Sequence, residues 1–104
     1  MRVLLINHFP LQGSGSGIYT LNIANELVKT GNAVFVIDID NTEDDNEYSF
    51  LRRTIKCDEK INPDADLSFN FPCFTTHPRS TTTYYDLSDE QIREYIKVFC
   101  KVTN

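Results

Sequence analysis

The residues best suited to chemistry are three glycines that alternate with serines just before a predicted helix. Gly13, Gly15 and Gly17 enclose Ser14 and Ser16. The first amides of a helix lack an intrahelical partner and carry a partial positive charge, and glycine lets a ligand approach that backbone closely. The serine hydroxyls add further donors. We therefore predict a binding site for a phosphate or a carboxylate, with a merely tight strand-to-helix turn as the alternative.

The glycine spacing differs from the common nucleotide-binding fingerprints. The dinucleotide pattern G-x-G-x-x-G needs a further glycine where this chain has Ile18 or Thr20. The phosphate-loop pattern needs Gly-Lys followed by Ser or Thr, which the sequence lacks. Asp38 lies near the expected position of a ribose-binding acid, but acidic residues are common at strand ends. A nucleotide-cofactor domain is therefore the weaker interpretation.

Three other residues are candidates for binding a ligand. His8 follows the first apolar run, at the end of a strand where ligands of parallel sheets bind, although it also suits a hydrogen bond to a loop carbonyl. His77 and Arg79 lie in a threonine-rich loop, and a guanidinium group suits phosphate or carboxylate; plain loop residues are the alternative. Asp38 and Asp40 are a weaker general-base or metal pair, because we place them on opposite faces of a strand.

Composition argues against several classes of function. The net charge is -5, and no lysine and arginine cluster is present, so we expect no nucleic-acid binding. The three cysteines are odd in number and widely spaced, which indicates reduced thiols in the cytoplasm rather than disulfides or zinc. We expect no metal and no cofactor. The first apolar run is too short for a signal sequence or a membrane span, so membrane contact would be peripheral.

Hydrophobic periodicity predicts the elements that position these residues. A continuous apolar run over residues 3–6 indicates a buried strand, and apolar residues at helical spacing follow over residues 18–29. A second buried strand covers residues 33–37. We expect Ser16 to cap the start of the helix and Gly31 to end it in a left-handed conformation. This order predicts two parallel strands joined by a helix.

The remainder of the chain is less regular. Residues 48–57 fit either a short strand or an extended segment, whereas residues 67–71 alternate apolar and polar side chains and predict a half-buried strand. Ser88 and Gln91 have the spacing of a capping box, which predicts the start of an amphipathic helix.

These elements predict an α/β fold, a partial Rossmann-like domain of three layers with a mostly parallel sheet. Three strands and two helices are few for such a domain, and the apolar face of the last helix needs another layer. We therefore expect residues 1–104 to form one apparently truncated domain. Completion by a second copy, through the exposed helix face or the sheet edge, is the alternative.

Two stretches of the chain resemble a known family. Residues 1–38 begin MRVLLINHFP and carry the patterns GSGxY, N-x-A-x-E-L and G-x-x-V, and residues 69–96 include FPCFTTHPRS. These features resemble the amino-terminal part of GT-B-fold retaining glycosyltransferases of the glycogen-synthase and mannosyltransferase type. The resemblance implies sugar transfer from a nucleotide-diphosphate sugar to a sugar or lipid acceptor, in a cleft between two Rossmann-like domains.

The same resemblance implies roles for individual residues. In that family the loop after the first strand faces the donor phosphates, a role that falls here on Gly15, Ser16 and Gly17. The amino-terminal domain mainly holds the acceptor, which places His8, His77 and Arg79 on the acceptor side.

The chain also departs from the family pattern. It lacks the carboxy-terminal domain that binds the donor and the histidine-bearing strand end of the amino-terminal domain, so we expect no sugar transfer by this segment alone. A non-enzymatic module that self-associates is the alternative function.

Overall fold

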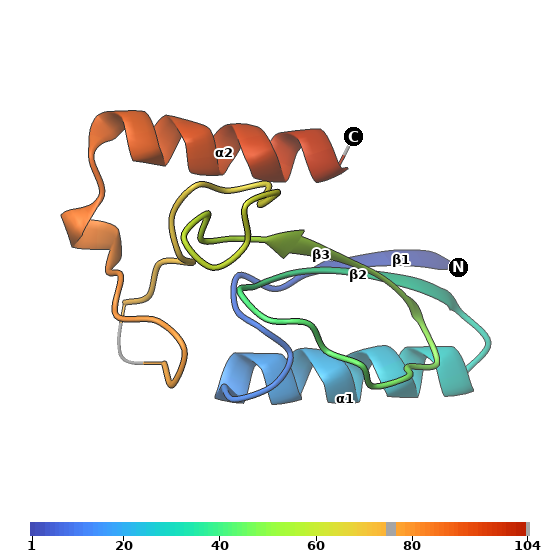
Figure 1. Cartoon of the computed structure of the whole chain (residues 1–104). Coiled ribbons are helices and arrows are strands. Elements are labelled where there is room, and N and C mark those ends of the chain that lie inside the picture. Colours follow the sequence, from blue (N-terminus) through green and yellow to red (C-terminus); the bar gives the residue numbers. More distant parts are fainter. Residues whose placement is uncertain (75–76, 104) are drawn as a thin grey trace.

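Three parallel strands form the centre of the fold. In a computed structural model that describes residues 1–74 and 77–103, the strands lie in the order β1-β2-β3, with bounds β1 (Arg2–Ile6), β2 (Ala33–Asp40) and β3 (Leu51–Lys56). Helix α1 (Gly15–Lys29) lies on one side of the sheet, and α2 (Asp89–Thr103), preceded by the 3-10 turn η1 (Tyr84–Asp86), lies on the other (Figure 1). The predicted α/β class with a parallel sheet is confirmed, and the arrangement is compatible with part of a Rossmann-like domain.

Two apolar clusters hold the three layers together, because successive side chains of β2 point to opposite faces. On the α1 side, Val34 and Val36 pack with Leu11, Ala24 and Phe50. The cluster on the α2 side contains Ile37, Ile39, Ile55, Cys57, Leu67, Phe71 and Cys73, with Tyr95, Val98, Phe99 and Val102 of α2 packed against it. Burial of β2 on both faces explains its nearly continuous apolar sequence.

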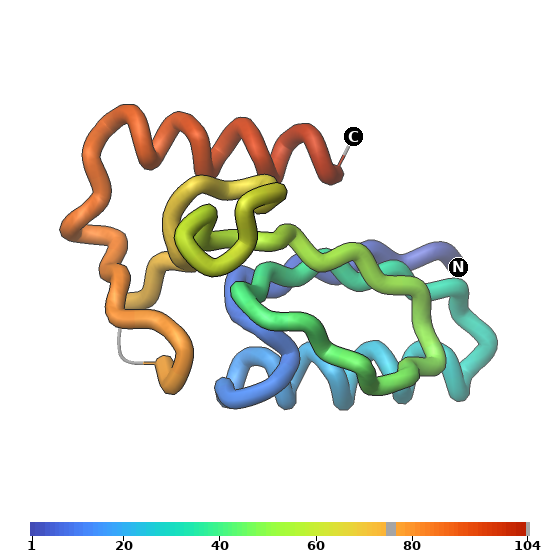
Figure 2. The backbone as a smooth tube through the Cα atoms, in the orientation of Figure 1, coloured from blue at the N-terminus to red at the C-terminus, as the bar shows by residue number. Residues whose placement is uncertain are grey.

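Both connections between strands run on the α1 side of the sheet. Helix α1 joins β1 to β2, and residues 41–50 join β2 to β3 along the same face, as the tube trace shows (Figure 2). Ser49 Oγ donates a hydrogen bond to Asn25 Oδ1 of α1 at 2.9 Å. Helix α2 lies on the opposite face of the sheet (Figure 1). Ligands of open parallel sheets bind outside the carboxyl ends of the strands.

The start of α1 differs from the prediction. Ser14, not Ser16, is the N-cap residue, with extended backbone angles and a side-chain oxygen that accepts a hydrogen bond from the Gly17 amide at 3.0 Å. Ser14 still has extended backbone angles, so the helix begins at Gly15. Ser16 already lies in the first helical turn and cannot be the N-cap. At the other end, Gly31 has a φ of +88°, as predicted for a left-handed residue after the helix.

The predicted capping box of α2 is confirmed. The Ser88 amide donates to Gln91 Oε1 at 2.9 Å, and the Gln91 amide donates to Ser88 Oγ at 3.2 Å. This reciprocal pair satisfies two amides that the helix itself leaves free. Within the described residues, neither helix combines the length and apolar character that crossing a membrane requires.

The predicted strand at residues 67–71 is wrong. Leu67 forms only an isolated parallel bridge with Cys57, and the third strand comes instead from the ambiguous stretch at residues 48–57. Leu67 and Phe71 are both fully buried, so they anchor an irregular segment beneath α2. Buried side chains at this spacing produce the same apolar–polar alternation as a strand. A strand, however, also needs a neighbouring strand whose edge is free for backbone hydrogen bonds.

Gly17 allows α1 to approach the preceding loop. A Cβ atom on Gly17 would lie 2.4 Å from the Pro10 carbonyl oxygen and 2.6 Å from that of Leu11, whereas nothing lies within 4 Å of a Cβ on Gly15. We predict that Gly17→Ala lowers the free energy of unfolding by about 1–3 kcal/mol, because the backbone must shift to admit the methyl group. Gly15→Ala should lose no stability. Equal urea-unfolding curves for the two variants would contradict this account of the loop.

Candidate anion-binding site

A cavity of about 470 Å³ opens at the carboxyl end of β1, between the glycine loop and a loop from the second half of the chain. It is lined by His8, Phe9, Gly13, Ser14, Gly15, Ser16 and Phe74. Its place beside β1 is the one at which ligands of open parallel sheets bind.

Local hydrogen bonds fix the loop between β1 and α1. Asn7 follows β1 and is buried; its Nδ2 donates to the Phe9 carbonyl at 2.7 Å. Ser14 Oγ lies 3.3 Å from the Pro10 carbonyl, to which it donates. Gly13 has a φ of +87°, a conformation that side-chain-bearing residues rarely adopt. These constraints turn the chain so that the first residues of α1 border the cavity.

Two amides at the start of α1 are available to a ligand. The Gly17 amide donates to Ser14 Oγ, and the Ile18 amide donates to the Ser14 carbonyl at 3.1 Å. The amides of Gly15 and Ser16 have no hydrogen-bond partner in residues 1–74 and 77–103. Both residues line the cavity, so the partial positive charge of the helix terminus is directed at it. Gly17, the third residue predicted to bind phosphate, is buried and outside the cavity lining.

His8 lies in the same cavity as these two amides. Its ring is half-buried, with its centroid 4.2 Å from that of Phe9. Burial lowers the pKa of His8 below its ordinary value, because desolvation disfavours the charged imidazolium. His8 is therefore neutral near pH 7, and it offers one hydrogen-bond donor and one acceptor to a bound ligand.

His77 lies behind the glycine loop rather than in the cavity. Its side chain is buried, and a Cβ on Gly13 would lie 3.4 Å from the His77 Nε2 and Cε1 atoms. Its Nδ1 accepts a hydrogen bond from the Arg79 amide at 3.1 Å. Burial, and secondarily the charge of Arg79, lowers the pKa of His77. In this position His77 supports the glycine loop from behind.

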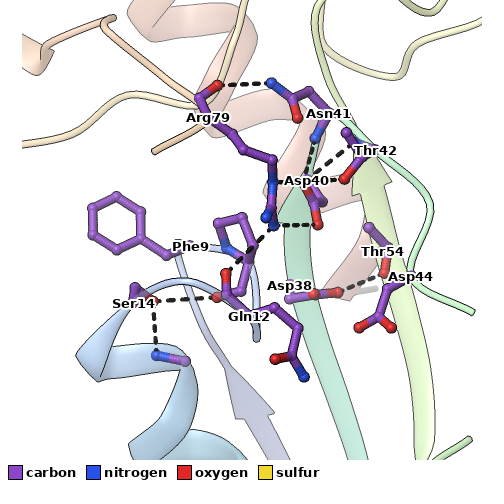
Figure 3. A network of polar contacts seen from close by, with 12 residues as sticks. Phe9, Gln12, Ser14, Asp38, Asp40, Asn41, Thr42, Asp44, Thr54 and Arg79 are labelled. Atoms are coloured by element: carbon purple, nitrogen blue, oxygen red, sulfur yellow. Dashed lines mark hydrogen bonds and ion pairs between the residues drawn. The ribbon is translucent and has the colours of Figure 1, made fainter. Parts of the chain in front are cut away.

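Arg79 connects three separate segments of the chain (Figure 3). Its Nε and Nη2 donate to the two carboxylate oxygens of Asp40 at 3.2 and 3.0 Å, and Nη2 also donates to the Gln12 carbonyl at 3.4 Å. The side chains of Asn41 and Asn70 each donate to the Arg79 carbonyl at 2.8 Å. The structure therefore brings Gly15, Ser16 and His8 together in one cavity, whereas His77 and Arg79 lie outside its lining.

The placement of Asp38 and Asp40 on opposite faces is wrong. Residues two apart in a strand share a face, and both carboxylates are buried on the α1 side of β2. They still act separately, since each holds its own arginine: Arg52 donates to Asp38 at 2.8 and 3.2 Å, and Arg79 pairs with Asp40. Among the residues that the structure describes, no group of three or more His, Cys, Asp or Glu side chains is arranged to hold a metal ion.

Two aromatic residues of the cavity were missed by the sequence reasoning. Phe9 and Phe74 form apolar walls of the cavity, and Phe74 remains 65% exposed while its ring lies 4.4 Å from that of Tyr84. Phe74 directly follows Phe71, Pro72 and Cys73, so the local sequence does not distinguish it from core residues. Phe74 reaches the glycine loop through long-range folding, which no local pattern encodes.

Comparison with protein-family models, curated proteins and solved structures finds no match to this chain. The chemistry of the site therefore rests on its geometry. Two free amides, a neutral imidazole and two aromatic walls supply groups for binding an anion that is attached to a less polar body.

Because Asp40 is buried beside Arg79, loss of the arginine should destabilise the whole fold. We predict that Arg79→Met lowers the free energy of unfolding by about 3 kcal/mol, since a buried carboxylate is left unpaired. The double variant Asp40→Asn with Arg79→Met should recover part of this loss. Arg93→Met, on the exposed side of α2, is the control and should stay within about 0.5 kcal/mol of the wild type in urea unfolding. An Arg79→Met variant as stable as this control would show that the pair contributes nothing.

Proposed function

We propose that the chain binds the diphosphate of a nucleotide sugar, as the acceptor-side part of a glycosyltransferase. One observation carries the proposal: the free amides of Gly15 and Ser16 and the side chain of His8 line one cavity at the carboxyl end of β1. The amides take the phosphate oxygens, because aligned backbone donors at a helix start favour negative charge. The resemblance of residues 1–38 to the glycosyltransferase family supports the same ligand.

The rest of the cavity suits the less polar part of such a ligand. Its volume of about 470 Å³ is within the range of roughly 300–1,000 Å³ for small-molecule sites. Phe9 and Phe74 present apolar surface to a ring, while His8 donates to or accepts from a hydroxyl group. Gly17 and Arg79 act indirectly. Gly17 allows α1 to pack closely against the preceding loop, and Arg79 fixes the glycine loop.

In this proposal the described residues bind the nucleotide sugar but do not transfer the sugar. The described side chains of the cavity supply donors and apolar walls, but they include no nucleophile paired with a base. Transfer to the sugar or lipid acceptor then needs groups from a donor-binding domain. We place the protein in the cytoplasm, consistent with free thiols at Cys57, Cys73 and Cys100.

Substitution of Gly15 isolates the contribution of one amide. Gly15 is the first residue of α1, where proline is well tolerated, and Ser14 before it is already extended, as a residue preceding proline prefers. We predict that Gly15→Pro weakens binding of a nucleoside diphosphate about tenfold, because one hydrogen bond to a charged ligand is lost. Gly15→Ala keeps the amide and serves as the matched control.

Chemical shifts of the glycine-loop amides measure this binding in titrations with uridine, adenosine and guanosine diphosphates. The proposal expects shifts centred on residues 13–16. Equal affinities for the two Gly15 variants, or absence of these shifts in the wild type, would refute it. Stronger binding of NAD than of any nucleoside diphosphate would favour a cofactor domain instead.

Self-association is a second candidate function, and the free edge of β1 favours it. In the described part of the chain β1 pairs with β2 alone, and its side chains Leu4 and Ile6 are 48% and 53% exposed on the face opposite α1. Their neighbour Phe35 is 38% exposed on the same face. Unpaired backbone groups beside exposed apolar side chains form a template for another strand.

A charge at the centre of this edge should prevent such pairing. We predict that Leu4→Lys converts a dimer to a monomer in sedimentation velocity, because two lysines would face each other across the paired strands. Ile61→Lys replaces an apolar side chain of similar exposure in a loop and should leave the dimer intact. A wild-type chain that stays monomeric at high concentration would exclude this candidate.

A further inference from the structure

A second cavity lies between α2 and the sheet, on the face opposite the glycine loop's helix. Its volume is about 720 Å³, and it is lined by Phe35, Arg53, Ala65, Asp66, Lys97, Val98, Lys101 and Val102. Phe35 lies near the amino end of β2, whereas the glycine loop lies at the carboxyl end of β1. The two cavities are therefore at different ends of the sheet and share no lining residue.

The floor of this cavity is apolar. Phe35 belongs to the central strand of the sheet, where side chains are normally covered on both faces, yet it is 38% exposed. Val98 and Val102 of α2 lie one turn apart and border the cavity from the helix side. An apolar ligand body placed here would remove Phe35 and both valines from water, which is favourable in proportion to the area buried.

The rim of the cavity is positively charged. Lys97 and Lys101 are exposed and lie one turn apart on α2, and neither forms an ion pair with a described residue. Arg53 contributes a third cation from β3. Asp66 is the one carboxylate in the lining, and its contacts with Arg53, at 3.3 and 3.4 Å, are long and partly exposed.

This local charge is opposite to that of the whole chain. Three cationic side chains against one carboxylate leave the rim positive, while the net charge of the protein is -5. Lysines that cover apolar surface without carboxylate partners favour an anion from the solvent. The positive rim therefore requires an anionic group on the ligand, and the apolar floor requires an apolar body.

We propose that this cavity binds a small molecule with an apolar body and a single anionic head group, of the class of medium-chain carboxylates. The body lies against Phe35, Val98 and Val102, and the head group lies between the ammonium groups of Lys97 and Lys101. A volume of about 720 Å³ is that of a small-molecule site, and the proposed ligand is a dissolved monomer. The inference is independent of the nucleotide-sugar proposal.

Dodecanoate below its micelle concentration is the probe for the whole chain. Amide shifts should cluster at Phe35, Val98 and Val102, and calorimetry should give a saturable isotherm. Acetate tests the head group alone, and dodecyltrimethylammonium tests the apolar body with the opposite charge. The proposal expects no binding of acetate and at least fivefold weaker binding of the cation than of dodecanoate.

Removal of the rim charges should selectively weaken the binding of the carboxylate ligand. The double variant Lys97→Gln with Lys101→Gln should bind dodecanoate about tenfold more weakly and lose most of the salt dependence, because exposed charges act through screened attraction. Lys60→Gln, in an exposed turn, is the control and should bind as the wild type does. Both lysines of α2 are exposed, so circular dichroism should show an unchanged fold.

Three outcomes would overturn the proposal. Unchanged affinity of the double variant would remove the role of the rim, and shifts centred on Leu4 and Ile6 would move the ligand to the β1 edge. Co-sedimentation with phosphatidylglycerol vesicles, in the absence of any shift with monomeric dodecanoate, would make the surface a membrane contact instead.

Discussion

The ion pair between Arg79 and Asp40 joins segments that are far apart in the sequence. Asp40 ends β2, and Arg79 also bonds to the Gln12 carbonyl, so one guanidinium group links the sheet, the glycine loop and the long loop before α2 (Figure 3). Two asparagine side chains hold the Arg79 carbonyl from the other direction. The walls of the cavity at β1 come from the segment between β1 and α1 and from the long loop before α2. The position of the free amides therefore depends on a partly buried charge pair that itself lies outside the cavity.

The two cavities differ in chemistry because one presents backbone amides and the other presents charged side chains. At the carboxyl end of β1, backbone amides provide the attraction for an anion, and they need no charged side chain. Under α2, charged side chains border an apolar floor left open on the sheet. A chain with a net charge of -5 repels anions at long range, so both sites depend on short-range groups.

Particular residues show where sequence reasoning succeeded and where it failed. The parallel β1-α1-β2 unit and the Ser88–Gln91 box follow from local periodicity and local hydrogen bonds, and both are present in the structure. The strand expected at residues 67–71 is absent, because buried anchors in an irregular segment produce the same alternation. The predicted N-cap, Ser16, lies two residues after the observed N-cap, Ser14, since both serines of the loop suit that position.

The sequence by itself determined the α/β class, the first parallel unit and the glycine-rich entry to α1, because each depends on neighbours within a few residues. Only the tertiary structure decided which of the candidate residues meet. It groups His8 with Gly15 and Ser16, assigns Arg79 to Asp40 at a separation of 39 residues, and brings Phe74 to the cavity wall. Contacts between distant segments arise from the packing of the whole chain, and no local pattern of residues records that packing.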